Sequence, residues 1–155
     1  MIISFTGHRL DKIGIKIPSE TYYKIYKSIE DKLKELKPSK TISGMALGVD
    51  QISAIISYRL NIPFIAAIPF KGQENLWNDK EKITYNKLLK LSCEQVVVNT
   101  GAYSASHYQT RNEWMVDNSD LLIAIFNGSK SGTANCVNYA KSKNKQPIII
   151  NPSDL

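Results

Sequence analysis

The sequence lacks the features of a membrane-bound, secreted or metal-stabilised protein. No apolar run approaches the roughly 20 residues that a helix needs to cross a bilayer. The first residues, MIISFTGHR, hold a short apolar segment with no basic stretch before it, which predicts a buried strand rather than a signal peptide. The two cysteines, Cys93 and Cys136, lie far apart without metal-type spacing, so we expect reduced thiols and no metal site. We therefore expect a cytoplasmic protein without a membrane partner.

Arginine is also scarce, which limits the side chains that can clamp a phosphate with a planar fork. Of the 20 basic residues, only Arg9, Arg59 and Arg111 are arginines. Lysines supply most of the net charge of +6, and many are scattered along residues 19–40 in the pattern of a solvated helix face. No compact stripe of basic and aromatic residues is present, so a nucleic-acid partner is disfavoured. No Walker loop and no Gly-x-Gly-x-x-Gly motif occurs either.

What the sequence does hold is a regular alternation of apolar runs with segments of helical period. Strands are expected near residues 2–6, 41–43, 64–68, 95–99, 121–126 and 147–151, and helices near 19–36, 48–60, 79–91, 106–118 and 132–143. Runs such as 121–126 are apolar on both faces, which is typical of parallel strands covered by helices on each side. The pattern predicts one domain, residues 1–155, with a doubly wound α/β fold. We expect a Rossmann-like three-layer sandwich around a mainly parallel sheet of about six strands.

Residues suited to ligand binding gather on one set of connections. In such a sheet every strand-to-helix loop emerges at the same edge. These loops read TGHR (6–9), SGMALGVD (43–50), PFKGQENLW (69–77), NTGAYSASHYQTR (99–111) and FNGSKSGT (126–133). They hold both histidines and two of the three arginines, whereas the helix-to-strand loops hold ordinary turn residues. The ligand site is therefore expected at the carboxyl ends of the strands.

Two of these loops have the composition of a phosphate-binding turn. Glycines and hydroxyls there precede a helix, where backbone N–H groups and the positive helix end can converge on an anion. The residues expected to bind are Gly128, Ser131, Gly132 and Thr133 in the segment NGSKSGTANC, and Gly44 and Gly48 in SGMALGVD. The alternative is a plain glycine turn in which Ser131 or Thr133 caps the helix. Taken together, the two loops suit a diphosphate, or a phosphate plus a ribose.

Several side chains at the same edge are candidates to complete the site. Asp50 either caps backbone N–H groups or holds a ribose hydroxyl. Arg111, expected to open a helix, is predicted to clamp a phosphate or a ribose. His8 either donates a hydrogen bond to the ligand or is satisfied internally, and His107 is expected at the surface. The remaining candidates are Thr6, Gly7 and Arg9 in the first loop, and Trp77, Tyr103 and Tyr108, which either stack on a base or are buried.

Several motifs, in order along the chain, carry a family resemblance. The segment RNEWMVDNSDLLIAIFNGSKSGT, residues 111–133, resembles the part of the SLOG superfamily in which an arginine-led helix, Ser-Asp, a strand and a Gly-Gly-x-Gly-Thr loop follow one another. SGMALGVD is similar to the Ser-Gly-x-Ala-x-Gly-x-Asp motif of the DprA branch. FTGHR, PFKGQENLW and YQTRNEWMVD resemble the YpsA-type branch most closely. The resemblance covers nearly the whole chain and implies a Rossmann-like domain that binds nucleotide-related ligands, as a homodimer or higher homo-oligomer, from a bacterium or a phage.

The resemblance also raises the question of catalysis. In the LOG branch, which hydrolyses the N-glycosidic bond of nucleoside monophosphates, the loop continues Gly-Thr-x-x-Glu, and this glutamate and the helix-leading arginine are catalytic. The resemblance places Arg111 at the arginine and Cys136 at the glutamate. We expect Cys136 to be a small packed residue rather than a reactive thiol. Glu113 and Asp120 remain as replacement acids, although Asp120 starts a strand at the opposite edge.

Three functions follow, in order of preference. The first is capture of an ADP-ribose-like or other nucleotide ligand, to sense or sequester it without turnover, because two phosphate loops occur with no obvious acid beside them. The second is a LOG-like nucleotide N-glycoside hydrolase, which needs a carboxylate near the sugar. The third is DprA-like DNA binding, motivated by the net charge of +6. No cofactor is expected.

Overall fold

A computed structural model describes the whole chain, residues 1–155, as one parallel sheet between two layers of helices. The strands are β1 (Ile2–Gly7), β2 (Lys40–Ser43), β3 (Phe64–Ile68), β4 (Glu94–Val97), β5 (Leu121–Ile125) and β6 (Ile148–Ile150). The helices are α1 (Glu20–Leu36), α2 (Val49–Arg59), α3 (Asp79–Leu91), α4 (Ala105–Asp117) and α5 (Gly132–Ser142), with two short 3-10 helices, η1 (Leu10–Ile13) and η2 (Pro152–Asp154). The predicted fold class and the six strands are confirmed.

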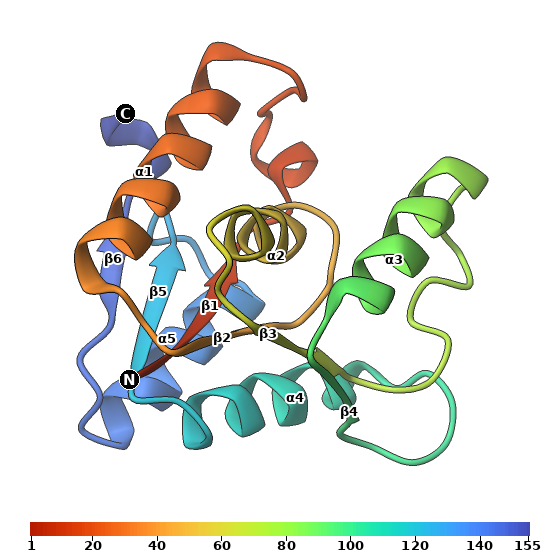
Figure 1. The fold of residues 1–155 in the computed structure, drawn as a ribbon. Helices are drawn as coiled ribbons and strands as arrows, with labels where there is room; N and C mark the ends of the chain where they lie inside the picture. The colour runs from red at the N-terminus through yellow and green to blue at the C-terminus, as the bar shows by residue number, and fades with distance from the viewer.

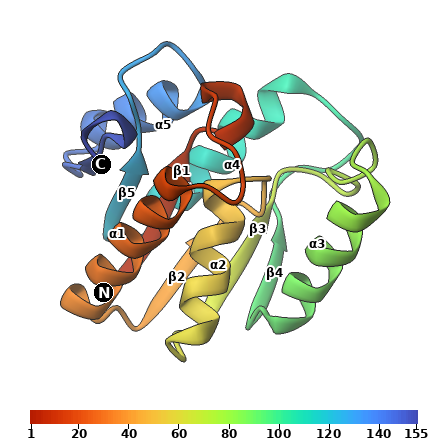
Figure 2. The same ribbon diagram turned by 90° about the horizontal axis from the view of Figure 1, so that it is seen from above.

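The order of the strands fixes where loops from distant parts of the chain meet. The sheet runs β4-β3-β2-β1-β5-β6, and every neighbouring pair is parallel. Helices α1, α2 and α3 cover one face, and α4 and α5 cover the other (Figure 1, Figure 2). The chain builds outward from β1 to β4 and then crosses to β5 on the far side of β1. The order therefore reverses between β1 and β5, which is the point where open α/β sheets form a crevice at the carboxyl ends of their strands.

The packing of both faces explains why the loops at this crevice are held in place. On one face, Ile3 and Phe5 of β1 pack against Ile25, Ile29 and Leu33, which recur every four residues along α1. Helix α1 begins at a cap in which the Ser19 side chain accepts a hydrogen bond from the Tyr22 N–H at 3.1 Å. Each fully buried isoleucine or leucine contributes roughly 1.5–3 kcal/mol of transfer free energy. Strands β1 and β5 at the crevice therefore contribute to the largest buried apolar cluster of the molecule.

The differences from the predicted elements are small, with one exception that matters for the site. The strands expected at 95–99 and 147–151 are shorter, Glu94–Val97 and Ile148–Ile150. The exception is η1, which was not predicted because four residues are too few to show a helical periodicity. It ends at Gly14, whose φ of 75° places it in the left-handed region. None of the helices is long and apolar enough to span a bilayer.

Candidate functional site

A small pocket of about 260 Å³ lies at the crevice between β1 and β5. We call it the switch-point pocket. It joins the loop after β1, the loop after β2, the inner face of α4 and the N-terminus of α5. Its lining residues are Thr6, Gly7, His8, Arg9, Lys12, Ala46, Asp50, Tyr108, Arg111, Asn112, Ser131, Gly132 and Thr133. Nine of the twelve residues predicted to bind ligand are thus brought together, and Gly44, Gly48 and Gly128 lie outside the lining.

The N-terminus of α5 forms one wall of the switch-point pocket. Ser131 is the N-cap, and its hydroxyl accepts a hydrogen bond from the Ala134 N–H at 3.2 Å. Of the two capping residues proposed from the sequence, Ser131 is therefore the one used. Gly132 and Thr133 form the first helical positions, where backbone N–H groups have no partner inside the helix. Together with the positive helix end, this wall favours an anion.

Arg111 does not open a helix, as the sequence pattern suggested, because α4 begins six residues earlier at Ala105. Its side chain lies buried, with only 4% of its surface exposed. Nη1 donates hydrogen bonds to the carbonyl oxygens of Gly44 and Ala67, and Nε donates to Asn112 Oδ1 at 2.9 Å. The guanidinium is thus anchored across the ends of β2 and β3, while Nη2 makes no hydrogen bond. Burial lowers the pKa of Arg111, and Asp50 opposes that shift.

Asp50 is the only carboxylate in the lining of the switch-point pocket. It is buried, with 7% of its surface exposed, and its Oδ2 accepts a hydrogen bond from the Ala46 N–H at 3.3 Å. It therefore holds the loop before α2 rather than capping the helix itself. Burial raises the pKa of Asp50, and the charge of Arg111 and the Ala46 N–H offset part of that rise. Oδ1 makes no hydrogen bond within the chain.

His8 connects the loop after β1 with the loop after β5. The Asn127 N–H donates to His8 Nε2 at 3.3 Å, so Nε2 is the acceptor and Nδ1 carries the proton in the neutral ring. Burial lowers the pKa of His8, which keeps the ring neutral at neutral pH. His8 lines the switch-point pocket, and donation from its Nδ1–H to a ligand stays a prediction. The two roles proposed for His8 are therefore compatible.

The glycines outside the lining have structural roles. A Cβ on Gly44 would lie 2.6 Å from Arg111 Nη1 and 2.7 Å from Asp50 Oδ2, so the absence of a side chain lets both groups pack there. Gly48 has a φ of 93° and lies against the backbone of residues 8–10. Gly128 is exposed and has a φ of 90°, and a Cβ added to it would meet no atom within 4 Å. The loop before α2 thus contributes Ala46 and Asp50 to the pocket rather than its glycines.

A second, aromatic pocket of about 590 Å³ adjoins the switch-point pocket and shares Arg9 and Tyr108 with it. Its walls include Phe70, Trp77 and Tyr103. Tyr103 is 69% exposed and stands edge-on to Phe70 at 5.8 Å between ring centroids. Trp77 is half-buried and packs edge-on against the buried Tyr85 at 5.3 Å. Both predicted stacking residues therefore line one pocket, and Tyr103 has the more accessible ring.

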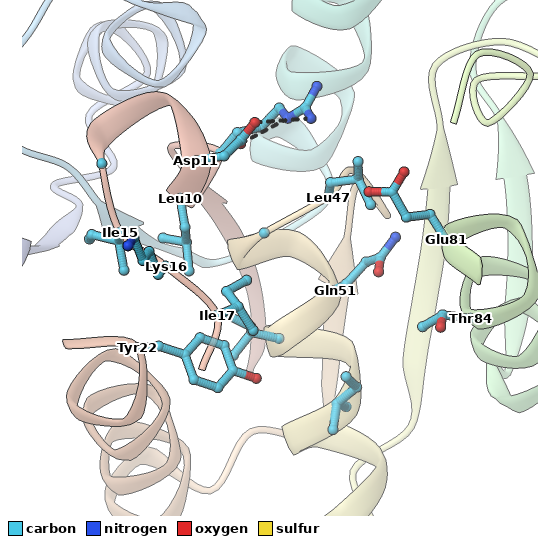
Figure 3. A pocket seen from close by; sticks show the side chains of 15 residues that line it. Leu10, Asp11, Ile15, Lys16, Ile17, Tyr22, Leu47, Gln51, Glu81 and Thr84 are labelled. Carbon is cyan, nitrogen blue, oxygen red and sulfur yellow. Dashed lines mark hydrogen bonds and ion pairs between the residues drawn. The ribbon is translucent and has the colours of Figure 1, made fainter. Parts of the chain in front are cut away.

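A third pocket, of about 840 Å³, runs over α2 between the segment 10–17 and α3 (Figure 3). We call it the α2 groove. In Figure 3 the apolar side chains of Leu10, Ile15, Ile17 and Tyr22 stand on one side of it, and Glu81 and Thr84 of α3 stand on the other. Arg9 lines all three pockets.

Neither Cys136, at the position of the catalytic glutamate, nor the two replacement acids line these pockets. Cys136 is fully buried among apolar residues of α4, β5 and α5, and burial raises its pKa to about 11. Glu113 is half-buried and accepts a hydrogen bond from Gln109 Nε2 at 3.1 Å. Asp120 lies at the opposite edge, where its Oδ2 accepts from the Ile2 N–H at 2.8 Å. The switch-point pocket therefore has Asp50 as its sole acid.

Four lining residues were missed by sequence reasoning as phosphate or sugar contacts: Lys12, Ala46, Tyr108 and Asn112. Lys12 comes from η1, whose only signal in the sequence is Gly14 two residues later. Asn112 follows Arg111 directly and orients its Nε. Within the chain no group of three or more His, Cys, Asp or Glu residues is arranged to hold a metal ion.

Comparison with known proteins places this geometry in a family context. A family model described as the YspA SLOG family matches residues 3–155. The chain is 34% identical over 134 residues to the uncharacterized SPbeta prophage-derived protein YoqJ of Bacillus subtilis, covering 76% of this chain and 78% of that protein. It is 27% identical over 143 residues to the UPF0398 protein YpsA of the same organism, covering 85% and 79%.

Two solved structures share the fold. DNA processing protein A (DprA) from Streptococcus pneumoniae aligns with a TM-score of 0.69 at 17% identity, over 95% of this chain and 49% of that one. DprA from Helicobacter pylori, described for its single-stranded DNA binding mode, aligns with a TM-score of 0.71 at 15% identity, over 99% and 70%. The chain thus spans about half the length of the S. pneumoniae protein. At these identities the likeness concerns the fold.

Proposed function

The chain belongs to the YspA SLOG family, and from that premise we propose that it binds a nucleotide-type ligand, ADP-ribose-like or related, to sense or sequester it without turnover. The observation that carries the proposal is the junction of an anion-binding pocket with an aromatic one through Arg9 and Tyr108. At about 260 Å³ the switch-point pocket is smaller than the roughly 300–1,000 Å³ of pockets that hold a whole drug-sized ligand. It therefore suits a phosphate and part of a sugar, and the base extends into the aromatic pocket.

The charges of the switch-point pocket support this placement. Arg9, Lys12 and Arg111 supply three cations, and the N-terminus of α5 adds backbone donors. Tyr103 supplies an exposed ring at the far end, where a base gains stacking energy of about 1–3 kcal/mol. The absence of turnover rests on Cys136, which occupies the position of the LOG glutamate inside the apolar core.

Isothermal titration calorimetry with AMP, NAD, ADP-ribose and its cyclic variants tests the proposal directly. We expect at least one of them to bind, and we expect Arg9→Gln to weaken that binding about tenfold or more, because a charge-assisted contact to phosphate is lost. Arg59→Gln is the matched control, since it removes the same charge at the other end of α2, where Arg59 contacts Tyr26. No heat with any of these ligands at millimolar concentration would remove the proposal.

A second function, nucleotide N-glycoside hydrolysis, is favoured by one observation. Asp50 brings a buried carboxyl into the same pocket as Arg111, and burial raises its pKa, as a proton donor to a leaving base requires. This hypothesis predicts release of free base from AMP-like or NAD-like substrates and loss of that release in Arg111→Ala. If chromatography detects no free base across a broad substrate panel, the hypothesis is to be dropped.

DNA binding is the least supported of the three proposals. The cations of α1 are largely paired within that helix: Lys24 with Glu20, Lys27 with Asp31, Lys32 with Glu35 and Lys34 with Glu30. This pairing leaves no continuous basic stripe along α1 for a phosphate backbone. A gel mobility shift at low salt that weakens steeply with added salt would reverse this ranking.

Assembly and biological setting are further parts of the proposal. We propose a homodimer or higher homo-oligomer, and native mass spectrometry of the freshly purified protein gives the subunit count and any retained ligand in one measurement. The similarity to YoqJ, a prophage-derived protein, supports a phage setting. In a phage protein, capture of a host signal nucleotide would lower the concentration of the free nucleotide without any turnover.

A further inference from the structure

The switch-point pocket contains one group that a phosphate alone does not explain. Its other polar lining groups include three cations, the neutral His8 donor and the donors of the α5 N-terminus. Asp50 is the exception: the charge of the neighbouring Arg111 and the Ala46 N–H favour its ionised form against the effect of burial, and a carboxylate in that form only accepts hydrogen bonds and repels a bare phosphate. A ligand that fills this pocket must therefore present a hydrogen-bond donor next to its negative charge.

The free atoms around Asp50 indicate what that donor is. Asp50 Oδ2 is used by the Ala46 N–H, and Oδ1 has no partner within the chain. Arg111 likewise uses Nε and Nη1 on the protein and leaves Nη2 without a partner. Asp50 Oδ2 and Arg111 Cζ each lie 2.7 Å from the point that a Gly44 Cβ would occupy, so the two side chains are immediate neighbours. A neighbouring free acceptor and free donor complement a hydroxyl group, which donates one hydrogen bond and accepts another.

Resting on the proposed nucleotide-binding function, we infer that the switch-point pocket recognises the 5′-phosphorylated ribose of a ribonucleotide, with a ribose hydroxyl donating to Asp50 Oδ1. The phosphate lies toward Lys12 and the N-terminus of α5, and the sugar lies toward Asp50 and Arg111. Asp50 is thus a specificity residue that rejects deoxynucleotides and inorganic phosphate. The cost arises because a ligand without the hydroxyl leaves a buried carboxylate without its donor.

Calorimetry with three closely matched probes tests this inference on the unaltered protein. The two deoxy probes, 2′-deoxyadenosine 5′-monophosphate and 3′-deoxyadenosine 5′-monophosphate, each lack one ribose hydroxyl. We expect AMP to bind about 10- to 100-fold more tightly than the probe that lacks the hydroxyl from which Asp50 accepts its hydrogen bond. Equal affinities for all three would overturn the inference and leave the proposed function standing. Failure of AMP to bind, with ADP-ribose or NAD still bound, would do the same. Failure of every nucleotide would remove both.

A variant then assigns the discrimination to Asp50. Asp50→Asn keeps the size of the side chain and removes the charge, so we expect the ratio between AMP and the weaker deoxy probe to fall to within about threefold. Inorganic phosphate should bind this variant more tightly than the native protein, because the repulsion is gone. Asp31→Asn is the matched control, since Asp31 is exposed on α1, pairs with Lys27 and lines none of the three pockets. A ratio unchanged in Asp50→Asn would show that another group reads the hydroxyl.

Discussion

Gly44→Ala provides a stringent test of how the site is assembled. The new Cβ would lie 2.6 Å from Arg111 Nη1, 2.7 Å from Arg111 Cζ and 2.7 Å from Asp50 Oδ2, distances that no real Cβ tolerates. Gly44 does not have a positive φ, so the backbone itself accepts alanine. The destabilising part of the effect therefore arises from displacing the buried guanidinium and carboxylate.

The size of the effect follows from the bonds that Arg111 loses. Displacement breaks its hydrogen bonds to the Gly44 and Ala67 carbonyls, each worth roughly 1.5–3 kcal/mol for a charged donor. Alanine returns about 0.4–1 kcal/mol by restricting the unfolded chain. We expect a net loss of about 2–5.5 kcal/mol in the free energy of unfolding, or ~5–20 °C in Tm for a domain of this size. Nucleotide affinity should fall with it.

Urea unfolding followed by circular dichroism measures this loss. Gly132→Ala is the control, because Gly132 has no atom within 4 Å of the added Cβ and no positive φ, so its stability should stay within about 0.5 kcal/mol or rise slightly. In an Arg111→Met background, Gly44→Ala should cost at least about 1 kcal/mol less than in the native protein. A cost under about 0.5 kcal/mol for Gly44→Ala, or an equal cost in both backgrounds, would refute this account of the site.

Three further predictions follow from the environment of single side chains. The pKa of His8 is lowered in the folded state, so the unfolded chain binds a proton at higher pH and the free energy of unfolding should fall as the pH drops below about 6.5. In His8→Gln, the change of the urea midpoint between about pH 7.5 and 5.5 should be smaller than in the native protein. Ellman's reagent at pH 8 should modify the exposed Cys93 and spare the buried Cys136, and two rapidly reacting thiols per native chain would contradict the packing. Lys145→Met should lower the free energy of unfolding by about 1–3 kcal/mol, because Nζ donates hydrogen bonds to the carbonyl oxygens of Val116 and Ser119 at 2.7 and 2.8 Å. An unchanged urea midpoint would show that these bonds do not stabilise the fold.

Much of the fold was predictable because local patterns and tertiary packing agree. The run 121–126 is apolar on both faces and forms the interior strand β5, between β1 and β6, and the Ser19 cap marks the start of α1 within one residue. The location of the pocket was predictable for a topological reason, since parallel strands deliver their following loops to one edge. Arg9 and Thr133 are distant in sequence and meet for that reason alone.

The parts that could not be predicted depend on close contacts between distant segments. Gly44 and Gly48 have the same local pattern as an anion-binding loop, yet they make room for Arg111 and for the backbone of residues 8–10. The pattern predicts the helix at 106–118, but nothing near Arg111 in the sequence indicates that its guanidinium lies across the ends of two strands. Lys12 was missed because η1 has no periodicity to detect. Side-chain direction and burial are tertiary properties in each case.

The position of Arg9 has a consequence for how the three pockets respond to one another. Its side chain is 45% exposed and its guanidinium contacts only Asp11, at 3.4 Å, yet it lines all three of the pockets described above. A guanidinium that turns toward a phosphate in one pocket withdraws from the mouths of the other two. The binding of a fragment in the aromatic pocket would therefore change the affinity of the α2 groove for another, without contact between them, through the free energy of orienting Arg9. The affinity of the site for a ligand would then depend on which pockets the ligand occupies as well as on its charge.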